Sequence, residues 1–540
     1  MSTTPLLDVN HLTIETDTGL RLVDDVSFSV GRREIVALVG ESGSGKTLSA
    51  LSLMGLLPAG VRHAGGNICL NGQIIANPDT FSAVSLRGQR MATIFQEPMT
   101  SMNPVLKVGE QIAEVLVRHQ KLSWKQAMRD AVALMELVGI INPAVCARQY
   151  IHQLSGGMRQ RVMIASAISC KPDLLIADEP TTALDVTIQA QILTLLQTLQ
   201  REMGMGILLI THDLSVVARY AHRACVMHRG RIVEQGEVPH LLTTPQHDYT
   251  RKLLAASQSS LSDTDRHDAT VVPLISIKDL TKSYPQRHRL PGFPATRHTV
   301  LFSTSLEIGK AEIVGLIGES GSGKTTLGRA AIGLIPADSG QIFFDGVDMA
   351  PVGKQHKALR RRAQIIFQDP YASLNPKMTI GEQIAEPLRV YKLRPAAQIA
   401  SRVDELLMLV GLEPQHASRL PGAFSGGQRQ RIAIARALAL EPDLLVADEA
   451  VSALDLSIRG QILALLDRLR SQLGLAVLFI SHDLSAVRQL CDRVIVLYHG
   501  NIVESGSTVQ VLNAPQHDYT RQLLDAAPDI NRALQLRQMS

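Results

Sequence analysis

One eight-residue segment occurs twice in this chain of 540 residues. Residues 40–47 and residues 318–325 both read Gly-Glu-Ser-Gly-Ser-Gly-Lys-Thr. Each copy follows a short apolar run, at residues 35–39 in the first case and at residues 313–317 in the second. Apolar runs of this length are typical of strands buried inside a parallel sheet. The repeat therefore predicts two α/β domains, each with a glycine-rich loop at the end of a buried strand.

The repeat continues well beyond this loop. Lys46 recurs as Lys324, 278 residues later, and Gln96 recurs as Gln368, 272 residues later. Solenoid repeats are only about 20–50 residues long, so these offsets indicate two copies of one domain. Four more residues recur at an offset of 270: Ser155, Glu179, His212 and Tyr249 match Ser425, Glu449, His482 and Tyr519.

A polar stretch separates the two copies. Residues 257–268 are short of large apolar side chains, which is typical of a flexible linker. We therefore expect domains at residues 1–256 and 274–540, joined by a linker at residues 257–273. Between Gln96 and Ser155 the pattern is helical, with a capping box at residues 123–126, so each α/β core is expected to carry a helical insert.

Composition argues against several other classes of protein. The chain has 54 basic and 50 acidic residues, and this near balance gives no reason to expect a nucleic-acid partner. Its five cysteines include no Cys-x-x-Cys pair, so neither disulfides nor a zinc site is expected. The N-terminus has no signal-peptide pattern, and no apolar run approaches the ~20 residues that span a bilayer. A role at a membrane would therefore depend on partner subunits.

The duplicated loop fits the pattern G-x-x-x-x-G-K-[ST]. Its glycines let backbone N–H groups surround phosphate oxygens, its lysine places charge at the β- and γ-phosphates, and its threonine hydroxyl can bind Mg²⁺. One match can be an ordinary glycine-rich turn, but two identical copies after apolar strands predict two nucleotide sites. The predicted loop contacts are Gly40, Glu41, Ser42, Gly43, Ser44, Gly45, Lys46 and Thr47, and Gly318, Glu319, Ser320, Gly321, Ser322, Gly323, Lys324, Thr325 and Thr326.

Two acidic residues end a later apolar strand in each copy. They are Asp178 with Glu179, after a strand expected at residues 174–177, and Asp448 with Glu449. The first carboxylate of each pair can help to hold Mg²⁺, and the second can polarise an attacking water. A single pair of this kind would more often be a solvated strand end. Its repetition at a matching place in both copies favours a catalytic role.

A Ser-Gly-Gly segment begins a helical stretch in each copy, at Ser155 and at Ser425. Free backbone N–H groups, the positive end of a helix and a hydroxyl together make an anion site. An ordinary N-cap serine has the same sequence. Since each half already has a phosphate loop, a second anion site makes sense if it reaches the nucleotide of the other half.

Two further polar positions lie beside predicted strands. His212 and His482 follow the last apolar strand of each half, where ligands gather in α/β folds. Gln96 and Gln368 mark the junction with the helical insert, and a neutral amide there can touch metal or water. A packed histidine and a solvated loop glutamine are the alternatives for these positions.

Together these motifs resemble the ATP-binding subunits of ABC transporters. Walker A, Q-loop, signature, Walker B, D-loop (residues 183–185 and 453–455) and H-loop occur in order, twice, over nearly the whole chain. The resemblance implies two P-loop NTPase domains of ABC type, each a RecA-like core with a helical subdomain. It also implies ATP hydrolysis with Mg²⁺, with Glu179, Glu449, His212, His482, Gln96 and Gln368 as catalytic residues and Thr47, Gln96, Asp178, Thr325, Gln368 and Asp448 as metal ligands.

The family further implies that the two halves pair head to tail within one chain, so that each site is shared. One site would join Lys46, Thr47, Gln96, Asp178, Glu179 and His212 with Ser425 and Gly427. The other would join Lys324, Thr325, Gln368, Asp448, Glu449 and His482 with Ser155 and Gly157.

Finer features are similar to the peptide and nickel importer subfamily. They are the stretches at residues 95–104 and 367–376 and the tail element Pro245-Gln-His-Asp-Tyr-Thr-Arg-Lys-Leu-Leu254, repeated at residues 515–524. Fused members of this subfamily include the ATPases of glutathione importers and of microcin C or oligopeptide importers, and this chain resembles those. The resemblance implies two membrane permeases and a solute-binding protein as partners, at the cytoplasmic face of the bacterial inner membrane. The cysteine cluster of many relatives is missing, so no iron–sulfur cluster is expected.

Several positions depart from the family pattern. The aromatic residue that stacks on adenine is matched by Tyr284 in the second half but by Thr16 in the first. Pro180 follows Glu179 and predicts an extended backbone there, whereas Ala450 after Glu449 removes that constraint. Met158 replaces the signature glutamine, and Phe424 replaces the signature leucine. None of these changes removes a catalytic group, so we expect both halves to hydrolyse ATP.

Two other functions fit parts of the pattern. A soluble twin ATPase acting on the ribosome has the same duplicated motifs, but it usually joins its halves by a long charged helix. A sugar-importer ATPase often has one degenerate half, whereas both halves here keep lysine and glutamate. A peptide-type importer therefore fits the sequence best.

Overall fold

The chain folds into two compact units. The computed structural model describes residues 4–80, 82–182, 184–257, 273–286, 296–349, 360–451, 454, 456–527 and 529–539. Unit 1 comprises Met1–Gln258 and Pro528–Ser540, and unit 2 comprises Ser259–Ala527. The sequence predicts a second domain that extends to residue 540, whereas the final segment belongs to unit 1. The predicted linker lies almost entirely outside the described residues.

A six-stranded sheet forms the centre of unit 1, in the order β10-β9-β3-β8-β7-β6. All neighbouring strands are parallel except β10, which pairs antiparallel with β9. The strands predicted from apolar runs are confirmed, and their side chains are almost all buried. The strands are β3 Ile35–Val39, β6 Met91–Ile94, β7 Leu174–Asp178, β8 Gly206–Thr211, β9 Arg223–His228 and β10 Arg231–Glu237.

A second, antiparallel sheet covers one side of this core, in the order β2-β1-β4-β5. Its strands are β1 Leu7–Thr16, β2 Arg21–Val30, β4 Val61–Leu70 and β5 Gln73–Ala76. Apolar side chains alternate along β1 and β2 and pack with those of the central sheet and α1 in one buried cluster. The alternation is typical of a sheet with one face buried and one exposed.

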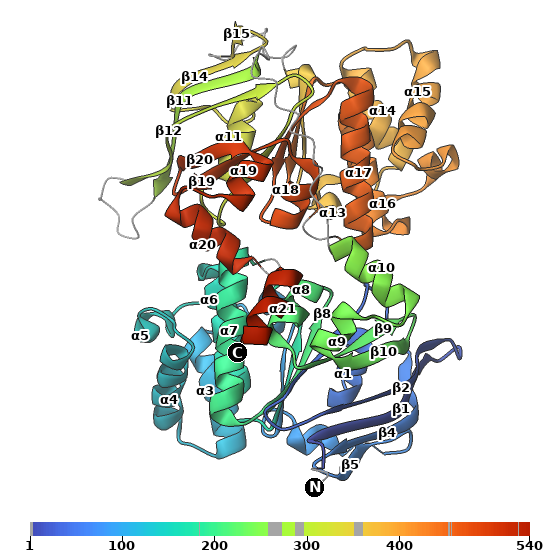
Figure 1. Ribbon diagram of the computed structural model, residues 1–540, viewed down its shortest axis with the longest axis vertical. Helices are drawn as coiled ribbons and strands as arrows, with labels where there is room; N and C mark the ends of the chain where they lie inside the picture. The colour runs from blue at the N-terminus through green and yellow to red at the C-terminus, as the bar shows by residue number, and fades with distance from the viewer. Residues whose placement is uncertain are drawn as a thin grey trace. The chain divides into compact units, whose positions relative to one another are not determined.

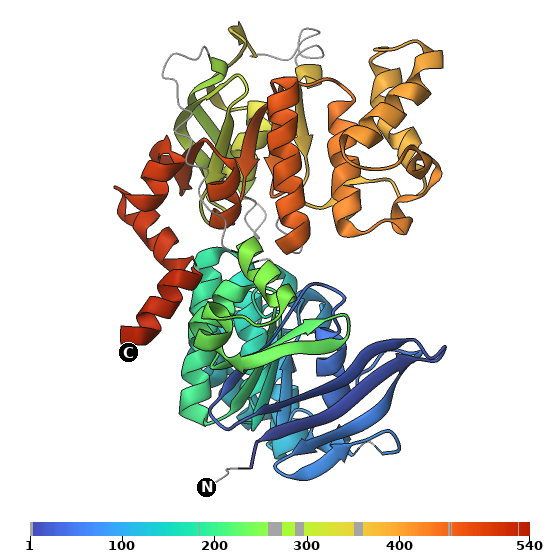
Figure 2. The same ribbon diagram turned by 45° about the vertical axis from the view of Figure 1, so that its right-hand side comes forward.

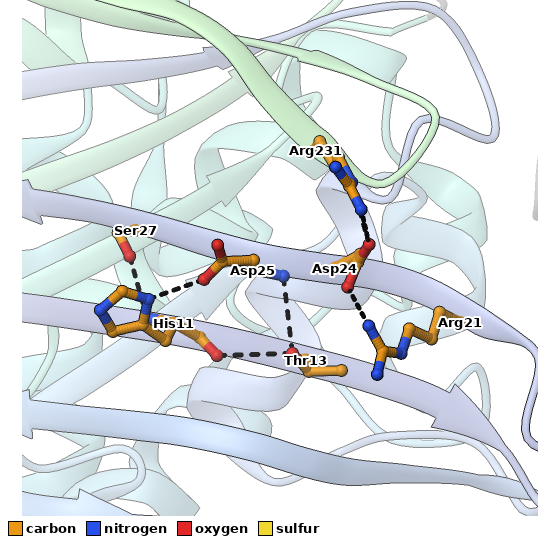
Figure 3. A network of polar contacts seen from close by, with 7 residues as sticks. All are labelled: His11, Thr13, Arg21, Asp24, Asp25, Ser27 and Arg231. Carbon is orange, nitrogen blue, oxygen red and sulfur yellow. Dashed lines mark hydrogen bonds and ion pairs between the residues drawn. The ribbon is translucent and has the colours of Figure 1, made fainter.

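An ion pair between Asp24 and Arg231 joins the antiparallel sheet to β10 (Figure 3). The Asp24 carboxylate on β2 accepts hydrogen bonds from Arg21 on the same strand and from Arg231 on β10. Its backbone N–H also donates to the carbonyl of Gly230. In unit 2 the corresponding backbone bond, from Phe302 to Gly500, is kept without a carboxylate. The first half therefore adds charge to a contact that the second half makes through the backbone.

Helices cover the other face of the central sheet and form the predicted helical insert (Figure 1), whereas α1 packs in the cluster shared with the antiparallel sheet. Ser123 caps α4, because its side chain accepts the N–H of Gln126, but the Gln126 side chain bonds to Asp130 and Arg129 instead of completing the predicted capping box. The helices are α1 Lys46–Met54, α2 Pro98–Ser101, α3 Val108–Gln120, α4 Trp124–Leu137, α5 Pro143–Cys146, α6 Gly156–Ile168, α7 Val186–Met203, α8 Leu214–Tyr220, α9 Val238–Thr243 and α10 Asp248–Ser257, with short 3₁₀ turns at Ala83–Leu86 and Ile151–Gln153.

The last helix of the chain, α21 Ile530–Met539, also belongs to unit 1. It lies beside α8, as Figures 1 and 2 both show. Ile530 and Ala533 are buried in the large apolar cluster of this unit, and the Arg537 guanidinium donates to the carbonyl of Ala221, where α8 ends. Burial lowers the pKa of Arg537. The first unit is therefore completed by residues from the far end of the sequence.

Unit 2 repeats the two-sheet plan. Its central sheet has the order β16-β17-β18-β13-β19-β20, and its antiparallel sheet has the order β12-β11-β14-β15. The strands are β11 Pro273–Gln286, β12 Thr296–Gly309, β13 Ile313–Ile317, β14 Ser339–Phe344, β15 Val347–Asp348, β16 Ala363–Ile366, β17 Leu444–Asp448, β18 Ala476–Ile480, β19 Arg493–Tyr498 and β20 Asn501–Ser507.

The helices of unit 2 follow the same succession. They are α11 Lys324–Ala331, α13 Pro370–Ser373, α14 Ile380–Val390, α15 Ala396–Leu409, α16 Gly426–Leu438, α17 Leu456–Leu473, α18 Leu484–Leu490, α19 Thr508–Asn513 and α20 Asp518–Ala526, with 3₁₀ turns at Pro414–Ser418 and Pro421–Ala423. In the described parts of both units, no helix combines the length and the apolar character that crossing a bilayer requires.

Candidate nucleotide sites

The phosphate-binding loop of unit 1 connects β3 to α1. A Cβ atom on Gly40 would lie 2.2 Å from the carbonyl oxygen of Met227, so only glycine fits against β9. Gly45 has φ +101° and precedes the first turn of α1. These two glycines allow the chain to turn sharply from strand to helix. The first N–H groups of an α-helix have no acceptor within the helix itself, so the start of α1 points to the place where phosphates would bind.

Within this loop the lysine is buried and the tip is open. The Lys46 ammonium donates to the carbonyls of Gly40 and Glu41, over 2.7 and 2.8 Å. Ser42 and Gly43 are exposed, whereas Ser44 is buried. The loop backbone thus holds the lysine at the place where it would neutralise the phosphates of a bound nucleotide.

Threonine and aspartate meet at the end of β7. The Thr47 hydroxyl donates to Asp178, with Oγ1 3.4 Å from Oδ1. Burial and the adjacent Glu179 charge raise the pKa of Asp178 to about 6, against the opposing effects of Thr47 and Lys46. A buried carboxylate whose negative charge is not balanced by its neighbours is a suitable ligand for a divalent cation. Thr47 and Asp178 are therefore suitable ligands for Mg²⁺.

Glu179 is the centre of a second group of contacts. Its carboxylate accepts hydrogen bonds from Gln96 Nε2 at 2.9 Å and from Thr182 Oγ1 at 2.8 Å, and His212 Nδ1 lies 3.1 Å away. Burial raises the pKa of Glu179, but the hydrogen bond and charge of His212, the hydrogen bond from Thr182 and the charge of Lys46 together hold this pKa below its usual value. The glutamate is thus kept ionised beside a buried aspartate.

Unit 2 brings the corresponding residues together. Gln368 Nε2 lies 2.5 Å from Oε2 of Glu449, and His482 Nδ1 lies 3.5 Å from Oε1. Burial raises the pKa of Glu449, but the His482 hydrogen bond and charge and the charge of Lys324 outweigh it, so this pKa too is lowered. The loop repeats the first one: Lys324 donates to Gly318 and Glu319. Ser320 and Gly321 are exposed, Ser322 and Gly323 are buried, and Thr326 lies in α11.

One ion pair distinguishes the second Walker B aspartate. Thr325 Oγ1 lies 3.0 Å from Asp448 Oδ1, and Arg329 Nη2 lies 3.9 Å from Oδ2. Burial raises the pKa of Asp448, while Thr325 and Arg329 oppose the rise. The residue at the corresponding place in α1 is Leu51, which carries no charge. The two predicted metal sites therefore differ in local charge.

The signature serines begin helices α6 and α16. Ser155 Oγ accepts the N–H of Met158, and Ser425 Oγ accepts that of Gln428. Of these two residues only Gln428 completes a capping box, because its side-chain oxygen Oε1 accepts the N–H of Ser425. A Cβ on Gly157 would lie 2.8 Å from Ile188 on α7, and one on Gly427 would lie 2.3 Å from Ile458 on α17. These glycines are thus required by helix packing, apart from any contact with nucleotide.

Two of the predicted departures can be compared with the structure. Tyr284 is exposed near the end of β11, and the corresponding Thr16 bonds within its own turn, to Thr18 and Leu20. The expectation about Pro180 is wrong, because Glu179 has φ +44° and Glu449 has φ +49°. In both units the glutamate N–H bonds to the neighbouring strand, so the chain must turn directly after it. Residues 183, 453 and 455 of the predicted D-loops lie outside the described residues.

Sequence reasoning missed Thr182 as a partner of Glu179 and assigned no role to Tyr249 or Tyr519. Each tyrosine hydroxyl accepts the N–H of the second loop residue, Glu41 or Glu319. Their recurrence at the same offset as the site residues was the available signal.

The chain is similar to known proteins over most of its length. Residues 23–182 and 301–452 match the ABC transporter family, and residues 503–539 match the oligopeptide/dipeptide transporter C-terminal region. The glutathione import ATP-binding proteins GsiA of Shigella flexneri and of Escherichia coli (strain K12) are each 47% identical over 96% of this chain and 89% of their own. A dimeric ATP-binding cassette bound to ADP and Pi is 29% identical over 43% of this chain and 98% of its own, with a TM-score of 0.39.

Proposed function

Because this chain belongs to the ABC transporter family of ATP-binding proteins, we propose that it drives the import of glutathione, oligopeptides or related small solutes by hydrolysing ATP at two sites. The observation that carries the proposal is the Glu179 carboxyl group, held by Gln96 and His212 next to Thr47 and Asp178. Unit 2 repeats this arrangement around Glu449.

Each group in the site has a distinct task. The loop N–H groups and Lys46 bind the β- and γ-phosphates, and Glu179 accepts a proton from the attacking water. His212 and Gln96 orient this carboxylate, and His212 also helps to keep it ionised. Thr47 and Asp178 would hold Mg²⁺, which neutralises charge on the phosphates when bound.

The coupling to transport is also a proposal. ATP binding would close the two halves on each other, with Ser155 and Ser425 completing the sites, and hydrolysis would reopen them. The segments after Gln96 and Gln368 would pass this motion to two membrane permeases supplied with solute by a binding protein. The chain would then act at the cytoplasmic face of the inner membrane without crossing it.

Purified protein tests the hydrolytic role. Glu179→Gln combined with Glu449→Gln should still bind ATP but lose turnover by about 10²-fold or more, because the general base is removed. Glu202→Gln, an exposed change on α7, is the matched control and should leave the rate unchanged. Normal hydrolysis by the double variant would overturn the assignment of the base.

Uptake measurements test the cargo. Cells that carry Lys46→Ala and Lys324→Ala should lose uptake of labelled glutathione or of a labelled tripeptide, and Lys125→Ala on the exposed surface of α4 should not. If the cells lose uptake of only one of these two labelled solutes, that solute identifies the class of cargo. Unchanged uptake of both would reject the peptide-type assignment while leaving the ATPase activity in place.

A further inference from the structure

The tail elements of the two halves contact the phosphate-binding loops directly. Tyr249, at the start of α10, accepts a hydrogen bond from the backbone N–H of Glu41, with N 3.1 Å from the hydroxyl oxygen. Tyr519, at the start of α20, accepts one from Glu319 at 2.9 Å. Both tyrosines are buried, with exposed fractions of 8% and 7%. The same contact therefore occurs independently in each unit.

The loop residue in this contact is held from both sides. The carbonyl of Glu41 accepts the Lys46 ammonium at 2.8 Å, and its N–H donates to Tyr249. In unit 2, Glu319 is held in the same way between Lys324 and Tyr519. The tyrosine thus fixes the same loop residue that the phosphate-binding lysine contacts.

Each tyrosine ring is itself held in place. Tyr249 stacks on His228 with ring centroids 4.0 Å apart, and Tyr519 stacks on Tyr498 at the same distance. His228 and Tyr498 directly follow the residues whose carbonyls face Gly40 and Gly318. The stacking partner differs between the halves, yet the hydroxyl reaches the same loop position.

The rest of the tail element supports the tyrosine through polar contacts. Glu234 on β10 accepts the N–H groups of Gln246 and His247, and His247 Nδ1 accepts the N–H of Tyr249. Unit 2 repeats these bonds around Glu504. Burial raises the pKa of Glu234 and Glu504, but the backbone hydrogen bonds outweigh it and lower both. The element is therefore built as a rigid support.

From these contacts we infer that Tyr249 and Tyr519 are positioning residues that hold the phosphate-binding loops in their nucleotide-accepting shape. The inference rests on the two ATP sites proposed above. It gives the Pro-Gln-His-Asp-Tyr element a physical task, since its histidine and tyrosine link β10 or β20 to the loop. Losing the hydroxyl leaves a loop N–H without its acceptor, so the loop must reorganise when ATP binds.

Tyr249→Phe and Tyr519→Phe test this inference because they keep the stacked ring. Each is placed in a background with the other half's loop lysine changed to alanine, so that one site is measured at a time. We expect the dissociation constant for ATP to rise about three- to ten-fold, as the loss of one hydrogen bond implies. We also expect faster amide hydrogen exchange in the peptide that covers residues 40–46, or 318–324, without nucleotide.

Tyr498→Phe is the matched control in unit 2. It keeps the stacked pair and removes a hydroxyl that makes none of the loop bonds described above, so ATP affinity and loop exchange should not change. If Tyr249→Phe and Tyr519→Phe bind ATP like the parent and their loops exchange at the parent rate, the inference is wrong. If the parent backgrounds themselves bind no ATP, the proposed sites fail instead.

Discussion

The side-chain amide of Gln96 donates a hydrogen bond to Glu179, with Nε2 2.9 Å from Oε2. The residue that joins the core to the helical insert therefore touches the proposed general base directly. A movement of the insert would change the surroundings of this carboxylate directly.

Gln96→Glu should disturb the contact between residue 96 and Glu179 more than Gln96→Ala. The alanine variant removes one hydrogen bond, and we expect hydrolysis at the first site to fall about ten-fold. The glutamate variant adds a like charge, which raises the pKa of Glu179 and moves the pH optimum upward. Steady-state hydrolysis from pH 6 to pH 9, in a Lys324→Ala background, measures both effects. Gln73→Ala, an exposed change on β5, is the control, and identical profiles for both Gln96 variants would contradict the argument.

Asp178→Asn should stabilise the metal-free protein at neutral pH. The pKa of Asp178 is about 6 in the folded chain and about 3.9 when unfolded. Between these values the folded state binds more protons, so the free energy of unfolding falls as pH rises, by of order 1–3 kcal/mol in total. Asparagine keeps the oxygen that accepts from Thr47 and avoids this loss.

Melting temperatures in EDTA measure this effect at pH 7.5 and pH 4. The stabilisation by Asp178→Asn should be present at pH 7.5 and absent at pH 4, whereas Asp79→Asn, at an exposed position, should show no such difference. If Asp178→Asn raised the melting temperature equally at both pH values, the view that burial raises the pKa of Asp178 would be wrong.

Tyr284→Ala should weaken ATP binding at the second site, because stacking on a base contributes about 1–3 kcal/mol. We expect the dissociation constant to rise about five-fold or more in a Lys46→Ala background, and Tyr284→Phe to bind normally. Thr16→Ala, at the corresponding place in the first half, should leave binding at the first site unchanged when measured in a Lys324→Ala background. A loss of affinity in Thr16→Ala would reject the view that only the second site stacks the adenine.

Exchanging the two signature residues should shift stability in opposite directions. Gln428→Met removes the bond to the Ser425 N–H and should destabilise the start of α16 by about 0.5–1 kcal/mol. Met158→Gln can form the same capping box at α6 and should gain part of that amount, since Met158 also packs against the core. Amide exchange of the first helical turn measures both, and parallel shifts in the two variants would contradict this account.

Ile530→Ala should destabilise the first unit by about 2–4 kcal/mol, the usual range for a buried isoleucine. Because α21 lies on α8, amide exchange should rise in α8 and not in the corresponding α18 of unit 2. Asn531→Ala, at an exposed position of the same helix, is the control. A change confined to α20 and unit 2 would show that α21 does not stabilise the first unit.

The elements that carry the sites were predictable because each is encoded locally. Ile35–Val39 and Ile313–Ile317 are apolar runs, and each is followed by a loop whose pattern is typical of phosphate binding. The prediction ended the strand at residues 174–177 one residue early, because Asp178 still pairs with Ile210 on the neighbouring strand.

Long-range contacts could not be predicted in this way. Tyr249 reaches Glu41 across 208 residues, and Arg537 reaches Ala221 across 316. A pattern of apolar residues shows that a helix has a buried face, but not which surface covers it. The backbone of Glu179 was likewise predicted wrongly, because its bond to Ile210 decided the conformation against the local preference of the Glu-Pro pair.

The place of α21 has a consequence for biosynthesis. In chain order unit 2 is an insertion within unit 1, since residues on both sides of it build the first core. A ribosome therefore finishes all of unit 2 before Ile530 and Ala533 become available to their neighbours. Until then, the apolar surface of unit 1 that Ile530 and Ala533 cover stays exposed. A gene cut at the segment between the halves would leave α21 on the wrong fragment, and the two products would have to find each other to complete one core.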